Sequence, residues 1–254
     1  MNIISWNTNG LRGTIKNNLW EPFLKATKAD VVCLQETKSE PTQLPVDFPG
    51  VGWHSAYSWS KLKKGYSGVS IFSKEKPVRF IDGMGIKKFD DEGRTIIAEY
   101  KNFYLVNCYF PNGGGGPHRL EYKLEFYDAF LKFVEKLRKE KEVIFTGDVN
   151  TAHTEVDLAR PKENSENTGF LPIERAWMDK VVSKGFVDVW RSFFPDKKDV
   201  YTYWDQKTRA RDRNVGWRID YFFASPKIFK KIKETKVYSD VFGSDHCPIS
   251  IRLD

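Results

Sequence analysis

Four segments of this chain each place acid, amide or histidine side chains at the end of an apolar, strand-like run. They are residues 5–10, 34–38, 146–150 and 243–248. A buried carboxylate without a partner is costly, so a fold does not gather several of them at strand ends without a binding partner. The simplest partner for Asn, Glu, Asp and His side chains in one place is a hard metal ion beside a reacting phosphate.

The length and composition predict one globular domain over residues 1–254. A chain of 254 residues can bury a sizeable core, and 40% of its residues are hydrophobic and 15% aromatic. No apolar run reaches the roughly 18 residues that a membrane span needs. The first residues already resemble a strand and not a signal peptide, so we expect a cytoplasmic protein that acts at the nucleoid.

Charge and cysteine content point to a polyanionic partner and a reducing compartment. The 41 Lys and Arg residues exceed the 34 Asp and Glu residues, which gives a formal charge of +7. Such a charge suits a nucleic acid, although alone it is a weak signal. The three cysteines, Cys33, Cys108 and Cys247, are too far apart for a zinc motif, so we expect buried thiols in the cytosol.

The order of predicted elements indicates an α/β fold with two packed sheets, mainly antiparallel or mixed, flanked by helices. Apolar periodicity predicts helices over residues 15–27, 118–139 and 172–184. Strands are expected at residues 2–6, 31–35, 53–58, 68–73, 95–100, 104–109, 143–146, 201–204, 217–224, 235–238 and 249–253.

Two connections stand out from the rest. Residues 155–171 form a long polar stretch, which makes them a candidate functional loop. Four consecutive glycines at 113–116 lie between a predicted strand and a predicted helix, and we expect a mobile loop there.

Asp148 and Asn150 follow a buried strand and, two positions apart, can project the same way. A carboxylate and an amide side by side can activate and orient a water molecule. The alternative is an ordinary turn, because Gly, Asp and Asn are common turn residues.

Glu36 ends another buried strand and is a plausible carboxylate ligand for Mg²⁺, which takes few protein carboxylates. Its alternative is a solvated strand end. Asn7 and Asn9 alternate toward one side of their strand end. The alternative for them is a hairpin turn, because Asn9-Gly10 is a strong turn signal.

Asp220 lies in an aromatic strand-like run, where an aspartate needs a partner. His246 is the best candidate, since an Asp–His pair fixes the imidazole tautomer and can keep it protonated beside a phosphate. Asp245 and His246 would face opposite ways on a regular strand, but residues 243–244 imply a turn that relaxes this constraint. The alternative is a turn-capping Asp245 and a structural histidine.

Tyr109 and Asn112 close another buried strand and could contact a reacting phosphate, or could be a core ring and a turn amide. Basic and aromatic residues mix at 61–66 and again at 201–217. Arginines contact phosphates, and aromatic rings can stack on bases, so these segments favour DNA contact over a solvated basic loop.

Taken together, the motifs resemble one family. They are Ser-Trp-Asn-x-Asn-Gly-Leu-Arg at 5–12, Leu-Gln-Glu-Thr-Lys at 34–38, Lys-Gly-Tyr-Ser-Gly-Val at 64–69, Tyr-Phe-Pro-Asn at 109–112, Gly-Asp-x-Asn-Thr-Ala-His at 147–153, Asn-Val-Gly-Trp-Arg-Ile-Asp-Tyr-Phe at 214–222 and Gly-Ser-Asp-His-Cys-Pro at 243–248. In this order and over essentially the whole chain, they resemble exonuclease III-type apurinic/apyrimidinic (AP) endonucleases of the endonuclease/exonuclease/phosphatase superfamily.

The resemblance implies a four-layered α/β sandwich with its site at one edge of the two sheets. It implies a monomeric enzyme that acts on double-stranded DNA with abasic or 3′-blocked sites, and on no membrane. The expected reaction is Mg²⁺-dependent cleavage on the 5′ side of abasic sites, with 3′-repair and 3′→5′ exonuclease activity. Mn²⁺ is the alternative metal.

The resemblance also implies roles for individual residues. Glu36 would bind the metal, with Asn7 and Asp245 close by; Asp148 would position or deprotonate the attacking water, with Asn150 orienting it; Asp220 would orient His246 against the scissile phosphate; Tyr109 and Asn112 would stabilise phosphate charge or the leaving oxygen; Tyr203, Trp217 and Ile219 would line the abasic-sugar pocket; Arg119, Arg209 and Lys38 would contact the DNA backbone or neighbour the site.

Two positions depart from the family pattern or vary within it. Asn9 stands where family members carry Asn or Asp, which leaves its role at the metal open. Residues 113–116 replace a loop where some relatives place a groove-entering arginine, a contact that is absent here or supplied by His118 or Arg119. The competing functions are a lipid or inositol phosphatase of the same superfamily and a DNA-binding protein without catalysis.

Overall fold

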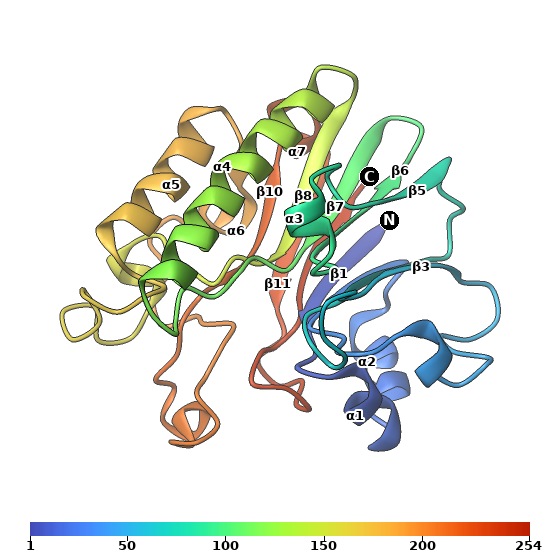
Figure 1. The fold of residues 1–254 in the computed structure, drawn as a ribbon, viewed down its shortest axis with the longest axis horizontal. Coiled ribbons are helices and arrows are strands. Elements are labelled where there is room, and N and C mark those ends of the chain that lie inside the picture. Colours follow the sequence, from blue (N-terminus) through green and yellow to red (C-terminus); the bar gives the residue numbers. More distant parts are fainter.

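The computed structural model describes residues 1–254 and consists of two six-stranded sheets packed face to face between helices. Figure 1 shows α4 and α5 on one side of the strands and α1 and α2 on the other. The helices are α1 (Leu11–Lys16), α2 (Trp20–Thr27), α3 (Lys87–Asp90), α4 (Pro117–Arg138), α5 (Pro172–Ser183), α6 (Val189–Phe193) and α7 (Pro226–Phe229), with short 3₁₀ turns η1 (Pro41–Gln43), η2 (Glu155–Asp157) and η3 (Ala210–Arg213).

Sheet I contains the N-terminal strand at its centre. Its strand order is β11 (Ile232–Val237), β12 (Ile249–Leu253), β1 (Asn2–Asn7), β2 (Val31–Gln35), β4 (Val69–Ser73) and β3 (His54–Ser58). The pair β1–β2 is parallel, and the other pairs are antiparallel. The C-terminal ends of β1 and β2 therefore meet at one edge of the sheet.

Sheet II has the same plan. Its strand order is β5 (Arg79–Asp82), β6 (Thr95–Glu99), β7 (Phe103–Cys108), β8 (Glu142–Asp148), β10 (Asp220–Ala224) and β9 (Val187–Asp188). Here β7–β8 is the parallel pair, crossed over by α4, and the other pairs are antiparallel. Each sheet thus presents the ends of two central parallel strands at one edge.

Three apolar clusters hold the four layers together. Between the sheets, Ile3, Val31 and Cys33 of sheet I pack with residues such as Leu105 and Ile144 of sheet II. The outer face of sheet II packs against aromatic side chains of α4 and α5, and the outer face of sheet I packs against α1 and α2. Central strands such as β2, β4, β6 and β7 are buried on both faces, which explains their continuous apolar runs. The predicted fold class is confirmed.

A buried polar contact joins the two sheets just behind their common edge. Gln35 Nε2 donates to Asn107 Oδ1 at 2.7 Å, and Asn107 donates in turn to the carbonyls of Leu34 and Ser70. These hydrogen bonds favour one relative position of the sheets, because sliding would leave the donors of Gln35 and Asn107 buried and unpaired.

Several predicted boundaries differ from the structure. The helix predicted over residues 15–27 is two helices, α1 and α2, because Asn18 adopts a left-handed backbone (φ 54°) between them. Asn9-Gly10 does not form a hairpin: the chain leaves β1, enters α1 and returns in β2, which is parallel to β1. This crossover excludes a two-residue hairpin at that position.

The predicted strand 201–204 is also wrong. Tyr203 makes only isolated bridges, to Trp217 and to His246, and β10 begins at Asp220 and not at Trp217. The short elements β5, β9, α3, α6 and α7 carry too few residues for a periodic pattern and were not predicted. No helix of the chain combines the length and the apolar character that membrane crossing requires.

Candidate active site

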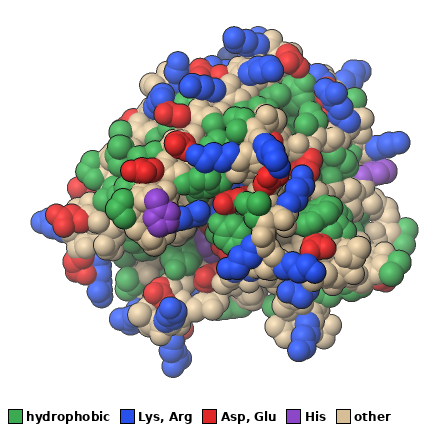
Figure 2. All heavy atoms as spheres, in the orientation of Figure 1, with side chains coloured by type: hydrophobic (Ala, Val, Ile, Leu, Met, Phe, Trp, Pro, Cys, Tyr) green, Lys and Arg blue, Asp and Glu red, His purple; other side chains and the backbone are tan.

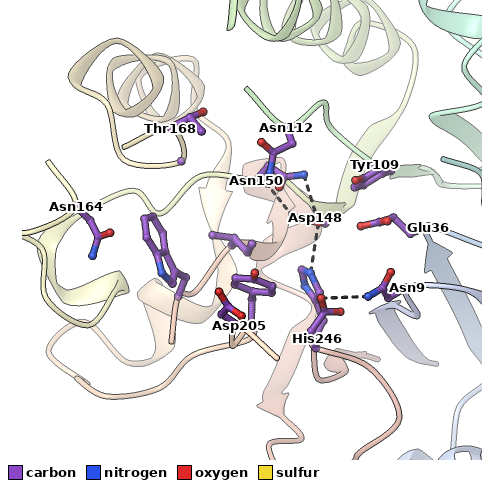
Figure 3. A pocket seen from close by; sticks show the side chains of 15 residues that line it. Asn9, Glu36, Tyr109, Asn112, Asp148, Asn150, Asn164, Thr168, Asp205 and His246 are labelled. Carbon is purple, nitrogen blue, oxygen red and sulfur yellow. Dashed lines mark hydrogen bonds and ion pairs between the residues drawn. The ribbon is translucent and has the colours of Figure 1, made fainter. Parts of the chain in front are cut away.

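The polar strand ends of both sheets converge on one cluster (Figure 3). Glu36 directly follows β2 of sheet I, Asp148 ends β8 of sheet II, and His246 lies in the turn before β12. Ligand atoms of these three side chains all lie within 4.8 Å of one another. The two parallel strand pairs therefore bring together the residues that the sequence placed far apart.

Asn7, at the end of β1, links the two carboxylates. Its Nδ2 donates to Glu36 Oε1 and to Asp148 Oδ2, both at 2.9 Å, and its Oδ1 accepts the backbone N–H of Asn9. With its amide nitrogen turned to the carboxylates, Asn7 holds the two acids and does not present an oxygen to a metal between them. With this orientation Asn7 would position the carboxylates around a metal and would not be a ligand itself.

His246 is held between two carboxylates of sheet II. Its Nδ1 lies 2.8 Å from Asp220 Oδ2 and its Nε2 lies 3.7 Å from Asp148 Oδ2. Burial opposes the charged ring, but the charges of Asp220 and Asp148 outweigh burial and raise the pKa of His246. The imidazole is thus protonated at neutral pH and can donate from Nε2.

The two acids of the cluster are shifted in opposite directions. Burial raises the pKa of Asp148, and the nearby charges of Asp220 and Glu36 add to this effect against the opposing charge of His246. Burial also favours the neutral form of Glu36, but the hydrogen bond from Asn7 and the charge of Lys38 bring its pKa below the usual range. Glu36 therefore stays ionised at neutral pH, whereas Asp148 is the acid that can take up or release a proton there.

Asn150 is fixed beside Asp148 by hydrogen bonds on both sides. Its backbone N–H donates to Asp148 Oδ1 at 2.8 Å, and its Nδ2 donates to the Phe110 carbonyl at 2.9 Å. Asn112 Nδ2 donates to Asn150 Oδ1 at 3.0 Å. Asn112 and Asn150 thus lie together on the sheet II side of the cluster.

A second layer of contacts surrounds Glu36. Lys38 Nζ lies 2.9 Å from Glu36 Oε2 and also donates to Asn9 Oδ1. Asn9 Nδ2 donates to Asp245 Oδ2 at 3.2 Å. Asp245 is not one of the three residues whose ligand atoms meet within 4.8 Å. Roles for Asn9 and Asp245 at a metal remain predictions.

Backbone strain is concentrated at this site. Asn9, Glu36, Lys38 and Asn150 all have φ between 46° and 56°, a left-handed conformation that non-glycine residues rarely adopt. Such strain persists only where the surrounding structure over-determines it, and it is common at functional sites. The hydrogen bonds around Glu36 and Asn150 supply that restraint.

A cavity of about 520 Å³ opens beside the cluster. Tyr203, Trp217 and Ile219 form its apolar wall, so the structure brings all three predicted pocket residues together. Sequence reasoning missed four further lining residues, Asn164, Thr168, Gly169 and Asp205. The signal for the first three was the long polar loop 155–171, which folds over the pocket. No pattern pointed to Asp205.

Tyr109 follows β7 and also lines the cavity. Burial and the neighbouring charge of Glu36 raise the pKa of Tyr109 well above its ordinary value. The hydroxyl is therefore protonated at neutral pH, so it can act as a hydrogen-bond donor and not as a phenolate acceptor.

The predicted DNA-contact cations differ in position. Arg119, in the first turn of α4, donates to the Tyr66 hydroxyl at 3.3 Å, whereas Arg209 pairs at 3.0 Å with Asp212 on the exposed segment around η3. That segment projects at the bottom of Figure 1, and Figure 2 shows Lys and Arg side chains at the same place. Neither arginine lines the cavity, so a DNA contact by either would lie outside it.

The donor set fits a hard divalent cation. Glu36 and Asp148 offer carboxylate oxygens within 4.8 Å of one another, which is the ligand type that Mg²⁺ prefers. Glu36 is partly open to the cavity, so a bound ion could keep water and phosphate ligands. His246 Nδ1 is occupied by Asp220, and its protonated Nε2 is a donor and not a ligand. Glu36 is thus the principal candidate ligand.

Comparison with known proteins agrees with this architecture. Residues 4–246 match the Endonuclease/Exonuclease/phosphatase family. The chain is 41% identical over 254 residues to the exodeoxyribonuclease of Bacillus subtilis (strain 168), covering 100% of both proteins. It is 40% identical over 257 residues to the DNA-(apurinic or apyrimidinic site) endonuclease of Dictyostelium discoideum, covering 100% of this chain and 71% of that protein.

A solved structure is similar over the same length. The 3′ phosphatase NExo from Neisseria, bound to a product DNA hairpin, superposes with a TM-score of 0.91 at 26% identity and covers 100% of this chain and 99% of that one. The predicted family and the predicted hydrolase class, of AP endonuclease and exodeoxyribonuclease type, are confirmed. By its strand-end cluster, its sandwich and its full-length relatives, this chain belongs to the Endonuclease/Exonuclease/phosphatase family.

Proposed function

We propose that this protein is a Mg²⁺-dependent DNA-repair phosphodiesterase that cleaves the backbone on the 5′ side of abasic sites, and that it also trims 3′-blocked ends and digests DNA from 3′ ends. The observation that carries this proposal is the position of the cluster of Glu36, Asp148 and His246 beside an apolar-walled cavity. The relatives named as exodeoxyribonuclease, AP-site endonuclease and 3′ phosphatase support the three activities.

The cavity suits a sugar without a base. An abasic nucleotide has no pairing to break, so turning it out of the helix costs less than turning out a paired nucleotide. Tyr203, Trp217 and Ile219 offer apolar contact to the sugar ring, while the polar cluster faces the adjoining phosphate. The protein would act as a monomer on double-stranded DNA, with its exposed cations along the phosphate backbone.

The chemical step would be a single displacement at phosphorus. Asp148 takes or orients the proton of the attacking water, and its raised pKa suits a base that works near neutral pH. Asn150, fixed at its backbone and side chain, orients the same water. His246 donates from Nε2 to a phosphate oxygen, and Tyr109 and Asn112 donate to oxygens that gain charge in the transition state.

Glu36 would hold the metal, Mg²⁺ or alternatively Mn²⁺, with Asn7 and Lys38 keeping its carboxylate in place. When bound, the ion supplies positive charge to the phosphate and to the departing 3′ oxygen. Asn9 and Asp245 would support this side of the site through their mutual hydrogen bond.

A substrate panel tests the proposal. The substrates are an abasic duplex, a nick with a 3′ phosphate, a uracil-containing duplex, an undamaged duplex and a phosphoinositide, each with and without Mg²⁺. We expect the abasic duplex to be cut fastest, on its 5′ side, and only with metal. DNA binding without any cleavage in saturating Mg²⁺ would contradict an enzyme, and preferential phosphoinositide hydrolysis would contradict a DNA substrate.

A further inference from the structure

Arg94 and Tyr109 lie side by side where two strands of sheet II end. Arg94 directly precedes β6, Tyr109 directly follows β7, and these strands pair with Thr95 opposite Cys108. The backbone N–H of Tyr109 donates to the Arg94 carbonyl at 2.8 Å, so the ladder continues by one residue pair. The sheet itself therefore places an arginine next to the proposed catalytic tyrosine.

The Arg94 side chain contacts both the backbone and the ring of Tyr109. It is 2% exposed. Its Nη1 donates to the Tyr109 carbonyl at 3.1 Å, and its guanidinium carbon lies 4.9 Å from the centre of the Tyr109 ring. A cation over an aromatic face is attracted to it, and the attraction is stronger away from water. These two contacts restrain the direction in which the Tyr109 ring points.

The other two nitrogens of Arg94 also donate hydrogen bonds. Its Nε donates to Glu92, and its Nη2 donates to the Tyr66 hydroxyl at 2.6 Å. A buried charge is tolerated only with a partner and good geometry, and Glu92 is that partner. Because each guanidinium nitrogen has a different acceptor, the planar group is held in one orientation.

Tyr66 connects this arrangement to the surface. It belongs to the basic-aromatic segment 61–66, and its hydroxyl also accepts from Arg119 Nη2 at 3.3 Å. The guanidinium of Arg94 lies 5.4 Å from the Tyr66 ring. Arg94 is thus sandwiched between an outer tyrosine, on a segment expected to contact DNA, and the inner tyrosine of the site.

We propose that Arg94 is a positioning residue for the reaction: it aims the Tyr109 hydroxyl at the scissile phosphate, and Tyr66 locks Arg94 in place. The inference rests on the proposed function, because it assigns the purpose of Arg94 to the chemistry of Tyr109. The proposed role of Arg94 is to orient Tyr109, so its effect on the rate passes through the tyrosine hydroxyl.

A double-mutant cycle on the single-turnover rate with abasic duplex tests this dependence. The first variant is Arg94→Lys, which keeps the positive charge but removes the planar guanidinium that holds three acceptors. The second is Tyr66→Phe, which removes one hydroxyl. Each is measured alone and combined with Tyr109→Phe. We expect Arg94→Lys to slow the single-turnover rate about 10-fold or more, and Tyr66→Phe about 3-fold or more. Once Tyr109→Phe has removed the hydroxyl, each should slow it less than about 2-fold further.

The matched control is Tyr104→Phe, in β7, the strand that Tyr109 directly follows. Tyr104 donates its hydroxyl to Glu140 at 2.9 Å, outside the cavity, so this variant should keep the wild-type rate. Duplex affinity measured in chelator should stay within about threefold of wild type for all variants, since the effect is on orientation.

Two results would overturn the inference. Fully multiplicative effects in the Tyr109→Phe background would show that Arg94 acts independently of the tyrosine. An unchanged rate in Tyr66→Phe and Arg94→Lys would show that neither residue sets the geometry. Should Arg94→Lys fail to fold, Tyr66→Phe alone completes the cycle. If the wild-type protein cleaved none of the substrates, the proposed function would be wrong, and the role assigned to Arg94 would fall with it.

Discussion

His246 Nδ1 and Asp220 Oδ2 lie 2.8 Å apart across the junction of the two sheets. Asp220 begins β10 of sheet II, while His246 precedes β12 of sheet I. The same ring faces Asp148 through Nε2. The Asp220 carboxylate thus stabilises the protonated form of this buried imidazole. The other ring nitrogen, Nε2, directs its N–H into the site beside Asp148.

Replacing Asp220 should change the pH dependence of catalysis as well as the rate. The Asp220 charge raises the pKa of His246, so Asp220→Asn lowers that pKa and the ring loses its proton at a lower pH. We expect a rate loss of about 10²-fold and a decline in activity that begins at lower pH. Single-turnover pH profiles measure both.

The chain offers a matched control for this prediction. Asp179 pairs with His153 at the same distance of 2.8 Å, with Asp179 on the surface of α5 and outside the cavity. Asp179→Asn should leave the profile unchanged. An unaltered profile in Asp220→Asn would mean that Asp220 does not set the charge of His246.

Replacing Asp148 should greatly reduce turnover but leave DNA binding intact. Asp148→Asn keeps the size of the side chain and removes the proton acceptor, so turnover should fall by at least about 10²-fold. Duplex affinity in chelator should be nearly unchanged, since no DNA-facing cation is lost. Asp128→Asn, at an exposed pair with Lys180, is the control. A loss of turnover below about tenfold would exclude Asp148 as the base.

Replacing Glu36 should weaken metal binding at the site. Glu36→Gln keeps an oxygen but removes the charge that a hard cation prefers. The Mg²⁺ concentration for half-maximal cleavage should rise by about tenfold or more. Titration of the DNA-free protein with Mn²⁺ by calorimetry gives a readout that does not depend on turnover. Glu75→Gln, on an exposed turn, should not change either value.

Removing the Trp217 ring should reduce selectivity for the lesion. Trp217 forms part of the cavity wall, and Gly169 packs so closely that a Cβ there would lie 3.4 Å from the ring. Trp217→Ala should lower kcat/KM on the abasic duplex by about 10-fold or more, with a smaller loss on undamaged 3′ ends. Trp190→Ala is the control, because the Trp190 ring packs at a tilt against Phe194 and does not line the cavity. Equal losses on both substrates would argue against a selectivity role.

Acid should destabilise the protein through a buried ion cluster behind the pocket. Asp157 accepts from Arg218 Nε at 2.8 Å and from Arg191 Nη2 at 2.5 Å. Burial would raise the pKa of Asp157, but the two arginines hold it well below the usual range. A folded-state pKa below the unfolded value gives stability that is complete above the unfolded pKa, about 4, and is lost as pH falls below it.

Asp157→Asn should therefore lower the free energy of unfolding at neutral pH by about 3–5 kcal/mol and flatten its dependence on pH below about 4. Urea unfolding at several pH values measures both. A variant that keeps the acid sensitivity of the wild type would place the relevant carboxylate elsewhere.

The strand ends were predictable because their physical signal is local. Runs such as Val31–Gln35 and Glu142–Asp148 are buried on both faces, so their apolar residues are continuous and the polar residues after them are conspicuous. The pairing of Asp220 with His246 was different. An aspartate in an aromatic strand needs a partner, which made His246 the best candidate, but a structural histidine fitted the residues as well. The contact depends on how the start of β10 in sheet II meets the turn before β12 in sheet I, which residue patterns do not specify.

What the sequence could not predict depends on side-chain packing between distant segments. Arg94 lies in a stretch without a motif, and its burial against Tyr109 follows from strand pairing that residue patterns do not specify. Asp205 is exposed, and exposed acids are ordinary on any surface. The break at Asn18 was missed because an apolar period can continue across a short interruption.

The division of the cluster between the two sheets has a consequence for when activity can appear during folding. Glu36 follows sheet I and Asp148 ends sheet II, so neither sheet alone carries both acids. A chain in which the two sheets have not docked therefore lacks the assembled cluster. Recovery of cleavage during refolding would therefore report the docking of the two sheets and not the formation of either sheet alone.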